Sequence, residues 1–279
     1  MPSSATSEPT SHYLVIKGMK VTRANAMPCP YLAGLPSMYG VVGMGRYLVN
    51  HALKGAGLVF DSIAVFVSVF SMSGSQQKYA CHSLPDIRKH QDIRIITARD
   101  SWFTADIIVR VSSLQNKSVE DLNDWLERHR HLDALYKLRF CGGHVLFAGG
   151  CPSVMAVSAS ELSEVCRHLT GFIIADRIEL CRSERRAGED ALDTVLRLIQ
   201  GSRAEGHGWL VPLLVGFSPL ELPVHRKNTR AALPHSYSEP VLGLGRLFSA
   251  QAVQSDLGIN EPFFWKPNPE RKFVVFGSI

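Results

Sequence analysis

Residues 21–53, VTRANAMPCPYLAGLPSMYGVVGMGRYLVNHAL, carry the strongest local structural signals in this chain. A strand-like apolar run, LVIKGMKV, leads into them, and apolar residues then recur at helical spacing between residues 37 and 54. Ser37 stands at the expected N-cap, because a serine hydroxyl accepts a hydrogen bond from the free N–H groups of a first helical turn. The pattern predicts a strand over 12–22, a proline-containing loop and a helix over 37–54.

Three glycines, Gly40, Gly43 and Gly45, lie in the first turns of the predicted helix. Each costs about 1 kcal/mol relative to alanine in a helix interior, so their presence needs a reason. We expect another backbone to pack closely against this part of the helix. Because Gly40 and Gly43 are one turn apart, the expected contact lies on the face that they share.

The remainder of the first half alternates strands with one more helix. Apolar periodicity predicts strands over 58–70, 103–111 and 137–147, and a helix that begins at the cap Ser118. A polar, basic segment, residues 71–101, separates two of these strands and contains a short predicted strand over 93–98. The resulting order, β-α-β-β-α-β, is that of ferredoxin-like and RRM-like domains. We therefore predict an α+β fold, with residues 1–150 as a ferredoxin-like domain.

The pattern changes beyond residue 150. Two amphipathic helices are predicted near 160–169 and 188–200, with strands around 172–175 and 206–217. Prolines, glycines and short aromatic runs dominate the sequence after residue 218. We predict that residues 151–279 form a less regular α/β extension packed on the first domain.

Composition sets broad limits on function. The chain has 279 residues, 46% hydrophobic and 20% charged, with a net charge of +5 that permits a polyanionic partner. Its six cysteines form no C-x-x-C pair or zinc-like cluster, and no apolar run is long enough to span a bilayer. We expect a cytoplasmic protein with reduced thiols, no cofactor, no metal and no membrane partner.

Arg23 and Asn25, at the end of the first predicted strand, form the first candidate site. Asparagine can bind base edges, and arginine can pair with phosphate or guanine. The alternative is structural: Asn25 could stabilise the turn before Pro28. The residues alone leave both interpretations open.

Arg139, Gly142 and Gly143 form the second candidate site. Glycines allow a ligand to approach the backbone closely, and exposed amides can bind phosphate. A glycine pair is also a common feature of bulges and turns, which is the alternative here.

Clusters of cations form the third and fourth candidate sites. They are Lys78, Arg88, Lys89 and Arg94 in segment 71–101, and Arg226, Lys227 and Arg230 after Pro223. Cations on extended loops suit a phosphate backbone, although charged loops are often only solvated.

Signals for an enzyme are weaker. The glycines of the predicted helix have the wrong position and spacing for a dinucleotide fingerprint, and no Walker motif is present. Cys141 and His144 could suggest a thiol nucleophile, but residues three apart on one strand point to opposite faces. Ser73 lacks the G-x-S-x-G context of a hydrolase nucleophile.

Five segments form one ordered pattern along the chain: R-A-N-A at 23–26 with G-L-P-S at 34–37 and H-A-L at 51–53, L-R-F-C-G-G at 138–143, G-W-L-V-P at 208–212, L-G-L-G at 242–245, and the aromatic segment 264–273. Taken together and in this order, they resemble the Cas-five class of CRISPR subunits, whose type I-F members are called Csy2. Each segment is short, but their common order over most of the chain is specific. The chain is shorter than the family in its middle and after residue 200.

The resemblance implies a ferredoxin-like fold of the RAMP superfamily, with segment 71–101 as a basic thumb that lies against CRISPR RNA. It implies a non-catalytic subunit of a Cascade surveillance complex that holds the 5′ handle of the guide RNA (crRNA). On this reading, Ser37 joins Arg23, Asn25, Arg139, Gly142, Gly143 and the cations named above as an RNA ligand. The implied partners are crRNA, the Cascade backbone subunits, a large subunit where one exists and, indirectly, target DNA. A CRISPR RNA-processing endoribonuclease of the same superfamily is the alternative.

Overall fold

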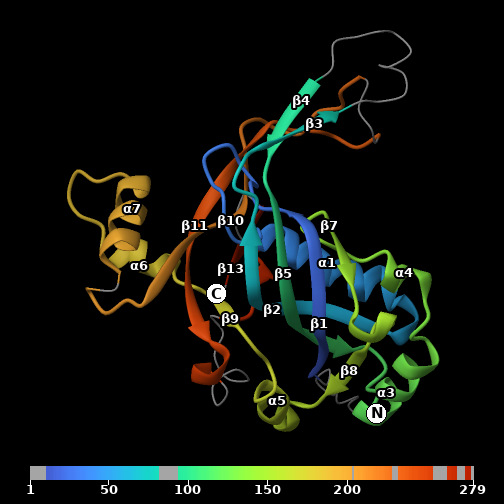
Figure 1. Cartoon of the computed structure of the whole chain (residues 1–279). Helices are drawn as coiled ribbons and strands as arrows, with labels where there is room; N and C mark the ends of the chain where they lie inside the picture. Colours follow the sequence, from blue (N-terminus) through green and yellow to red (C-terminus); the bar gives the residue numbers. More distant parts are fainter. Residues whose placement is uncertain are drawn as a thin grey trace, which may run out of the picture.

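The computed structural model describes residues 11–81, 94–202, 204–227, 232–253, 263–268 and 274–277. Within these residues, eleven strands form one curled antiparallel sheet (Figure 1). Its main order is β12-β13-β10-β11-β9-β2-β5-β1-β7-β6, and β8 also pairs with β1. The fold is therefore mixed α+β, with a large antiparallel sheet and few helices.

The centre of the sheet comes from the first half of the chain. Its elements are β1 (Ser11–Asn25), α1 (Met38–Tyr47), β2 (Leu58–Met72), β5 (Asp100–Ser113), α3 (Val119–Arg128), α4 (Asp133–Tyr136), β6 (Arg139–Phe140) and β7 (Gly143–Leu146). A single turn of π-helix, Leu48–Ala52, and a short 3₁₀ turn, Lys54–Ala56, extend α1. The predicted caps are present, since Ser37 Oγ accepts the Gly40 N–H and Ser118 forms a capping box with Asp121.

Both faces of the central strands are buried. Along β1, Leu14 and Ile16 belong to the larger core cluster with α1, whereas Tyr13 and Val15 belong to a second cluster on the opposite face. A strand covered on both sides is apolar at consecutive positions instead of alternate ones. This explains the continuous apolar character of the sequence that precedes residue 21.

The segment predicted as one strand over 137–147 is instead a tight hairpin, β6–β7. Its two turn residues, Cys141 and Gly142, have φ values of 46° and 83°, and Phe140 pairs with Gly143 across the turn. Positive φ at both central residues is the signature of a type I′ turn, which suits the twist of a hairpin. The single-strand prediction was wrong, and the alternative, a turn at the glycine pair, is confirmed at Gly142; Cys141 gave no such signal, because cysteine seldom adopts a positive φ.

The prediction for the helix glycines was right for Gly40 and wrong for Gly43. An alanine Cβ at Gly40 would lie 2.6 Å from Cys141 Sγ and 3.4 Å from Cys141 Cα. An alanine Cβ at Gly43 would have no atom within 4 Å beyond its own helical turn, so this glycine faces open space. Gly45 packs against the Phe60 ring instead.

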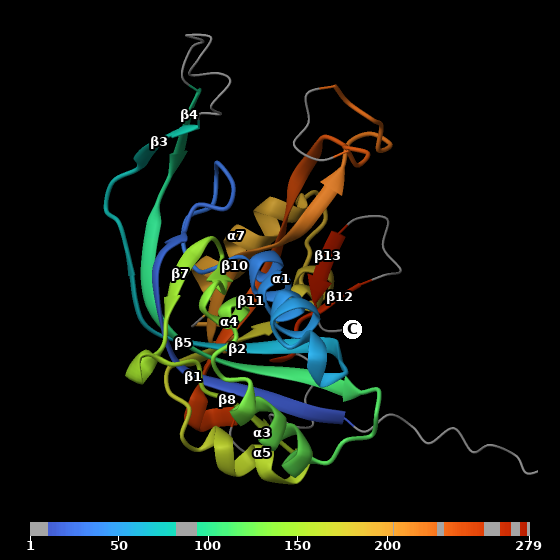
Figure 2. The same ribbon diagram turned by 90° about the vertical axis from the view of Figure 1, so that its right-hand side faces the viewer.

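Segment 71–101 contains a two-stranded hairpin, β3 (Gln77–Cys81) with β4 (Arg94–Ala98). The predicted strand over 93–98 is thus confirmed. Of the predicted cations, Arg88 and Lys89 lie outside the described residues, as do the side chains of Lys78 and Arg94. Figure 2 shows this hairpin and the β10–β11 hairpin extending from the same end of the molecule, with the loop between β1 and α1 between them.

The second half of the chain adds β8 (Val154–Val157), α5 (Ala159–Cys166), β9 (Phe172–Asp176), α6 (Ile178–Ser183), α7 (Ala191–Gly201), β10 (Trp209–Pro219), β11 (Ser238–Ser249), β12 (Lys266–Pro267) and β13 (Val274–Gly277). These strands join the same sheet, because β8 pairs with β1 and β9 pairs with β2. Trp265 is fully buried, and its Nε1 donates a 2.8 Å hydrogen bond to the Ile174 carbonyl. The domain boundary at residue 150 remains a prediction.

In the described ranges, no helix has the length and apolarity needed to cross a membrane.

Candidate functional site

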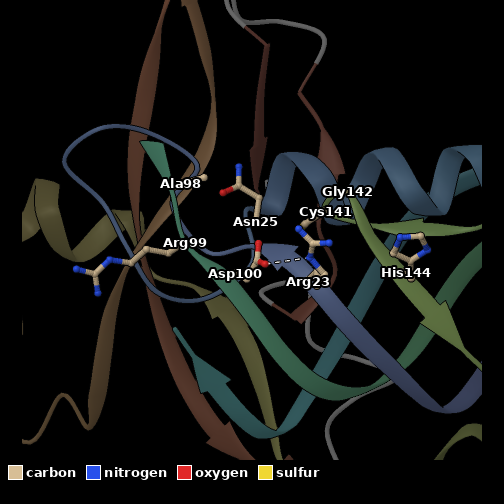
Figure 3. Close-up of a pocket in the computed structure, with 8 residues that line it drawn as sticks. All are labelled: Arg23, Asn25, Ala98, Arg99, Asp100, Cys141, Gly142 and His144. Carbon is tan, nitrogen blue, oxygen red and sulfur yellow. Dashed lines mark hydrogen bonds and ion pairs between the residues drawn. The ribbon is translucent and has the colours of Figure 1, made fainter. Parts of the chain in front are cut away.

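A cavity of about 380 Å³ lies where the end of β1, the base of the β3–β4 hairpin and the β6–β7 turn meet (Figure 3). Its lining residues are Arg23, Asn25, Ala98, Arg99, Asp100, Cys141, Gly142 and His144. Two of the sequence candidate sites, separated by more than a hundred positions, therefore meet at one place.

Arg23 is held at the cavity by an ion pair with Asp100. The register of β1 against β5 shifts between Val21 and Ala24, and Arg23 takes a positive φ of 57° in this irregularity. Its Nε donates to Asp100 Oδ2 at 3.1 Å, with 58% of the Arg23 side chain exposed and 8% of Asp100. Arg23 thus satisfies a buried carboxylate and still presents part of its guanidinium to solvent.

Asp100 also fixes the base of the β3–β4 hairpin. Its backbone N–H donates to Ser73 Oγ at 3.2 Å, and its carbonyl accepts the Ser73 N–H at 2.9 Å. The adjoining Arg99 carbonyl accepts the Ala26 N–H at 2.9 Å, which ties the same hairpin to the loop after β1. In Figure 3 the Arg99 side chain extends away from Arg23.

Asn25 has the structural role that the sequence left open. Its Oδ1 accepts the Met27 N–H at 2.9 Å, so the side chain stabilises the turn before Pro28. Its backbone N–H donates to the Cys141 carbonyl at 3.0 Å, which locks the end of β1 to the β6–β7 turn. The group that Asn25 can still offer to a ligand is its Nδ2 amide, a donor.

The glycine pair serves two different purposes. An alanine Cβ at Gly143 would lie 2.7 Å from the Ala24 nitrogen, so this glycine lets β7 pack against the β1 backbone. Gly142 has open space beside it and lines the cavity. The predicted ligand approach is therefore sterically open at Gly142, whereas Gly143 is required by the fold.

Arg139 and His144 pair across the β6–β7 hairpin at the rim of the cavity. Arg139 Nη1 donates to His144 Nδ1, and both residues are exposed. Cys141 lies in the intervening turn, where its thiol donates to the Ser37 carbonyl at 3.6 Å. Burial raises the pKa of Cys141 to about 12, so this thiol stays protonated and is a poor nucleophile.

A second cavity, of about 280 Å³, adjoins the first on the side of α1 and β10. Its lining residues are Asn25, Pro28, Ser37, Tyr39, Gly40, Cys141, Gly142, Leu214 and Phe217. Asn25, Cys141 and Gly142 line both cavities. Ser37 Oγ accepts the Gly40 N–H at 3.2 Å, so Ser37 borders this second cavity while it caps α1.

The structure thus groups five predicted residues, Arg23, Asn25, Ser37, Arg139 and Gly142. Arg226 and Lys227 lie elsewhere, in the loop between β10 and β11. There, Arg226 pairs with Glu221 and its guanidinium lies 4.4 Å from the Tyr237 ring centroid, whereas Lys227 is exposed. Arg230 lies outside the described residues. The RNA-binding roles of all these residues remain predictions.

Sequence reasoning counted Arg99 among the cations of segment 71–101 without naming it as a ligand, and it missed Tyr39 and Phe217. Tyr39 and Phe217 are 178 positions apart in the printed sequence, and their rings meet edge to face at 5.2 Å. Such a pairing leaves no local pattern. In the described portion of the chain, no group of three or more His, Cys, Asp or Glu side chains could hold a metal ion.

Comparison with known proteins agrees with the resemblance found in the sequence. No curated protein matches the chain in a direct search. The profile of one family, described as "CRISPR-associated protein (Cas_Csy2)", matches residues 14–272, which is nearly the whole chain. The chain therefore belongs to the CRISPR-associated Csy2 family, and so to the Cascade subunits of antiviral defence.

Proposed function

We propose that this protein is a non-catalytic, crRNA-binding subunit of a type I-F-like Cascade complex and that the cavity at Arg23 holds part of the 5′ handle. The observation that carries the proposal is the convergence of Arg23, Asn25 and Gly142 at one cavity, with Arg139 paired to His144 of its lining. Its partners are then crRNA, the Cascade backbone subunits and, where one exists, a large subunit. Target DNA is reached through the assembled complex.

Strand order supports a ferredoxin-like, RAMP-type core. In a split β-α-β unit, another strand lies between the two strands that the helix connects. Here α1 connects β1 and β2, and β5 lies between them in the sheet. The β3–β4 hairpin interrupts the connection from β2 to β5, the place where the family resemblance puts a thumb.

The electrostatics of the cavity support a ligand with phosphate groups. Arg23 and Arg139 contribute exposed guanidinium groups, which bind phosphate through paired N–H donors. The Asp100 carboxylate is buried and accepts a hydrogen bond from Arg23 Nε, so it balances the charge of Arg23 but not that of Arg139. The nearby Gly142 offers no side chain that would block a backbone approaching the turn.

The chemistry of the same residues supports a binding role without catalysis. The raised pKa of Cys141 keeps its thiol neutral at physiological pH. The Nδ1 atom of His144 accepts a hydrogen bond from the Arg139 guanidinium, so this ring nitrogen is already engaged within the protein.

The test is binding of the purified full chain to single-stranded repeat RNA that carries the 5′ handle. We expect the double variant Arg99→Ala/Arg139→Ala to bind more weakly, because both cations flank the cavity. The log–log salt dependence of affinity should flatten by about 0.7 for each phosphate that the variant no longer neutralises. RNA length should stay unchanged throughout the incubation.

The matched control is Arg167→Ala/Arg182→Ala, which removes the same charge from exposed arginines at the C-cap of α5 and on α6. Equal losses in both double variants would show that net charge, and not the cavity, determines binding. No binding by the unmodified chain at low salt would overturn the proposed function. Discrete cleavage of the RNA would favour the endoribonuclease instead.

A further inference from the structure

The second cavity differs chemically from the first although the two are contiguous. The first is bordered by Arg23, Asp100 and His144, which are all charged or polar. The second is bordered mainly by Tyr39, Leu214, Phe217 and Pro28. A ligand that fits both must have an ionic part and a flat or apolar part.

We infer that the cavity at Tyr39 is a pocket for one unstacked base of an RNA strand, whose adjoining phosphate lies at Arg23. This inference rests on the proposed function and names the chemistry of the ligand at that site. A nucleotide has both of these parts, a charged phosphate and, next to it, a planar base. Single-stranded RNA is recognised in this way, by phosphate contacts together with bases stacked on aromatic side chains.

Tyr39 is the residue that the base would contact. It lies in the first turn of α1, its side chain is 42% exposed, and its ring meets the Phe217 ring at 89° with centroids 5.2 Å apart. The edge-to-face contact with Phe217 orders the tyrosine ring before a ligand binds, so stacking on its exposed part costs little additional side-chain entropy. Leu214, 2% exposed, closes the floor of the pocket.

The polar groups that border the pocket indicate which part of a base enters first. Asn25 Oδ1 accepts the Met27 N–H, so its Nδ2 amide is the donor directed to a ligand. Ser37 Oγ accepts the Gly40 N–H and lies 3.9 Å from Cys141 Sγ, so its hydroxyl is engaged within the protein. A donor at Asn25 favours a base edge that presents an acceptor, such as the carbonyl oxygen of guanine, cytosine or uracil.

The volume sets the size of the ligand. Pockets for drug-sized molecules occupy about 300–1,000 Å³, and this pocket is about 280 Å³. It can therefore accept a single ring system but not a stack of bases. A strand that passes Gly142, which lines both cavities, meets no side chain there.

The experiment measures the affinity of the full chain for a set of handle RNAs, each with one base replaced by an abasic nucleotide. We expect one position to matter more than the others, with a loss of roughly ten-fold, the scale of one base stacked on an aromatic ring. Tyr39→Ala should lower affinity for the intact RNA by a similar factor. Tyr39→Phe keeps the ring and should bind like the unmodified chain.

Combining Tyr39→Ala with the abasic RNA distinguishes the loss of a base contact from a general loss of RNA binding. Tyr39→Ala should cause no further loss for the RNA that is abasic at the sensitive position, because the stacking partner is then already absent. Tyr136→Ala, which removes a 45% exposed tyrosine from α4, is the control and should leave affinity unchanged. Thermal unfolding of each variant checks that the fold is intact.

The outcomes separate the two hypotheses. RNA binding that is insensitive to Tyr39→Ala and to every abasic substitution would overturn the base pocket and leave the proposed function standing. Equal losses for intact and abasic RNA would also overturn it. Failure of the unmodified chain to bind any of these RNAs would overturn the proposed function, and the base pocket with it.

Discussion

Gly40 is the residue on which the geometry of the site depends most directly. An alanine Cβ there would lie 2.6 Å from Cys141 Sγ and 3.1 Å from Ser37 Oγ, so α1 or the β6–β7 turn would have to move. We predict that Gly40→Ala lowers the free energy of unfolding by about 1–3 kcal/mol, although alanine is the better helix former. Thermal or denaturant unfolding measures the change.

Gly43→Ala is the matched control, because the same substitution three residues later meets open space. It should stabilise the protein by up to about 1 kcal/mol. The cost of Gly40→Ala should also shrink in a Cys141→Ala background, because the closest atom is then missing. Equal effects at Gly40 and Gly43 would contradict the close approach of α1 to the turn.

The sequence located single residues of the site better than it assigned their roles. Ser37 could be recognised as a cap because the signal is local, and its hydrogen bond to Gly40 confirms it. Arg23 and Asn25 were identified, but their pairing with Asp100 and Cys141 joins residues that are far apart in the chain. Tyr39 gave no signal, because its partner Phe217 comes from a strand in the second half.

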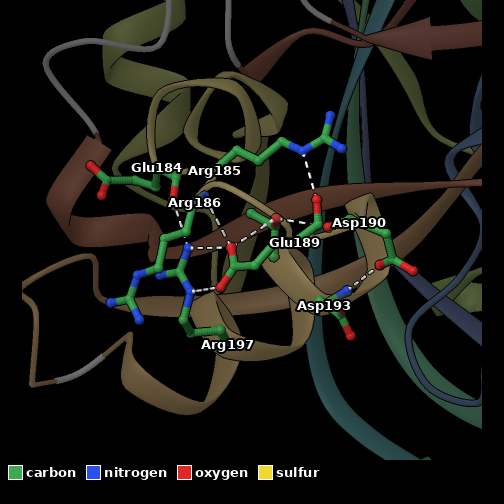
Figure 4. A network of polar contacts seen from close by, with 8 residues as sticks. Glu184, Arg185, Arg186, Glu189, Asp190, Asp193 and Arg197 are labelled. Atoms are coloured by element: carbon green, nitrogen blue, oxygen red, sulfur yellow. Dashed lines mark hydrogen bonds and ion pairs between the residues drawn. The ribbon is translucent and has the colours of Figure 1, made fainter.

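At the scale of elements, an ionic network ties the loop between α6 and α7 to α7, beside a small apolar cluster that the two helices share. Glu189 accepts hydrogen bonds from Arg197 Nε at 2.8 Å and Arg197 Nη2 at 3.0 Å, and others from Thr194 and the Arg186 backbone (Figure 4). The hydrogen bonds from Arg197, first of all, lower the pKa of Glu189 from 4.5 to about 2. The network therefore depends on the charge of one carboxylate.

We predict that this helical unit loosens in acid before the sheet does. A carboxylate with a lowered pKa stabilises the folded state fully above its ordinary value of 4.5, and this contribution is lost as the pH falls toward 2. Hydrogen exchange of the α7 amides should therefore accelerate over this interval. Glu189→Gln should give fast exchange at neutral pH and remove most of the pH dependence.

Glu179→Gln provides the comparison within the same unit. Glu179 pairs with Arg182 at 2.8 Å, but its side chain is 75% exposed, so the pair contributes little. Exchange in α7 should stay near that of the unmodified chain. If Glu179→Gln and Glu189→Gln had the same effect, the Glu189 network would not be what holds α7.

Elements with a regular apolar period could be predicted from the sequence, and those shaped by packing could not. The strand predicted over 58–70 is observed as β2, and the helix predicted from Ser118 is α3. Strand β11 was missed because Gly243 and Gly245 interrupt its apolar pattern. In the structure these glycines make room for Val215 and Leu213 of the neighbouring β10, so the apparent strand breakers permit close packing.

At the scale of the whole molecule, the central feature is that the sheet continues across residue 150. Composition and periodicity change at that point, which suggested two units. Pairing between strands is set by residues that are distant in sequence, and no local pattern reveals it. Two strands from the second half pair edge to edge with first-half strands in this sheet: β8 pairs with β1, and β9 pairs with β2.

This continuity leads to the last prediction, that residues 1–150 do not fold on their own. The fragment would expose the β2 edge that pairs with β9 and would lose Trp265, which is fully buried between Ile63 and Ile174. We expect an insoluble or non-cooperatively unfolding fragment, measured by circular dichroism and hydrogen exchange. Co-expression with residues 151–279 should restore the sheet, because every missing strand is then supplied.

A graded version of the same test keeps the chain intact. Trp265→Ala should lower the free energy of unfolding by about 3–5 kcal/mol, the usual cost of deleting a fully buried large aromatic side chain. Trp102→Ala removes a 38% exposed tryptophan from β5 and should cost much less. A single cooperative transition that shifts as a whole in Trp265→Ala would show that both halves unfold together. Two separate transitions, or a cooperatively folded 1–150 fragment, would instead establish two independent units, because a shared sheet cannot lose one half and leave the other unchanged.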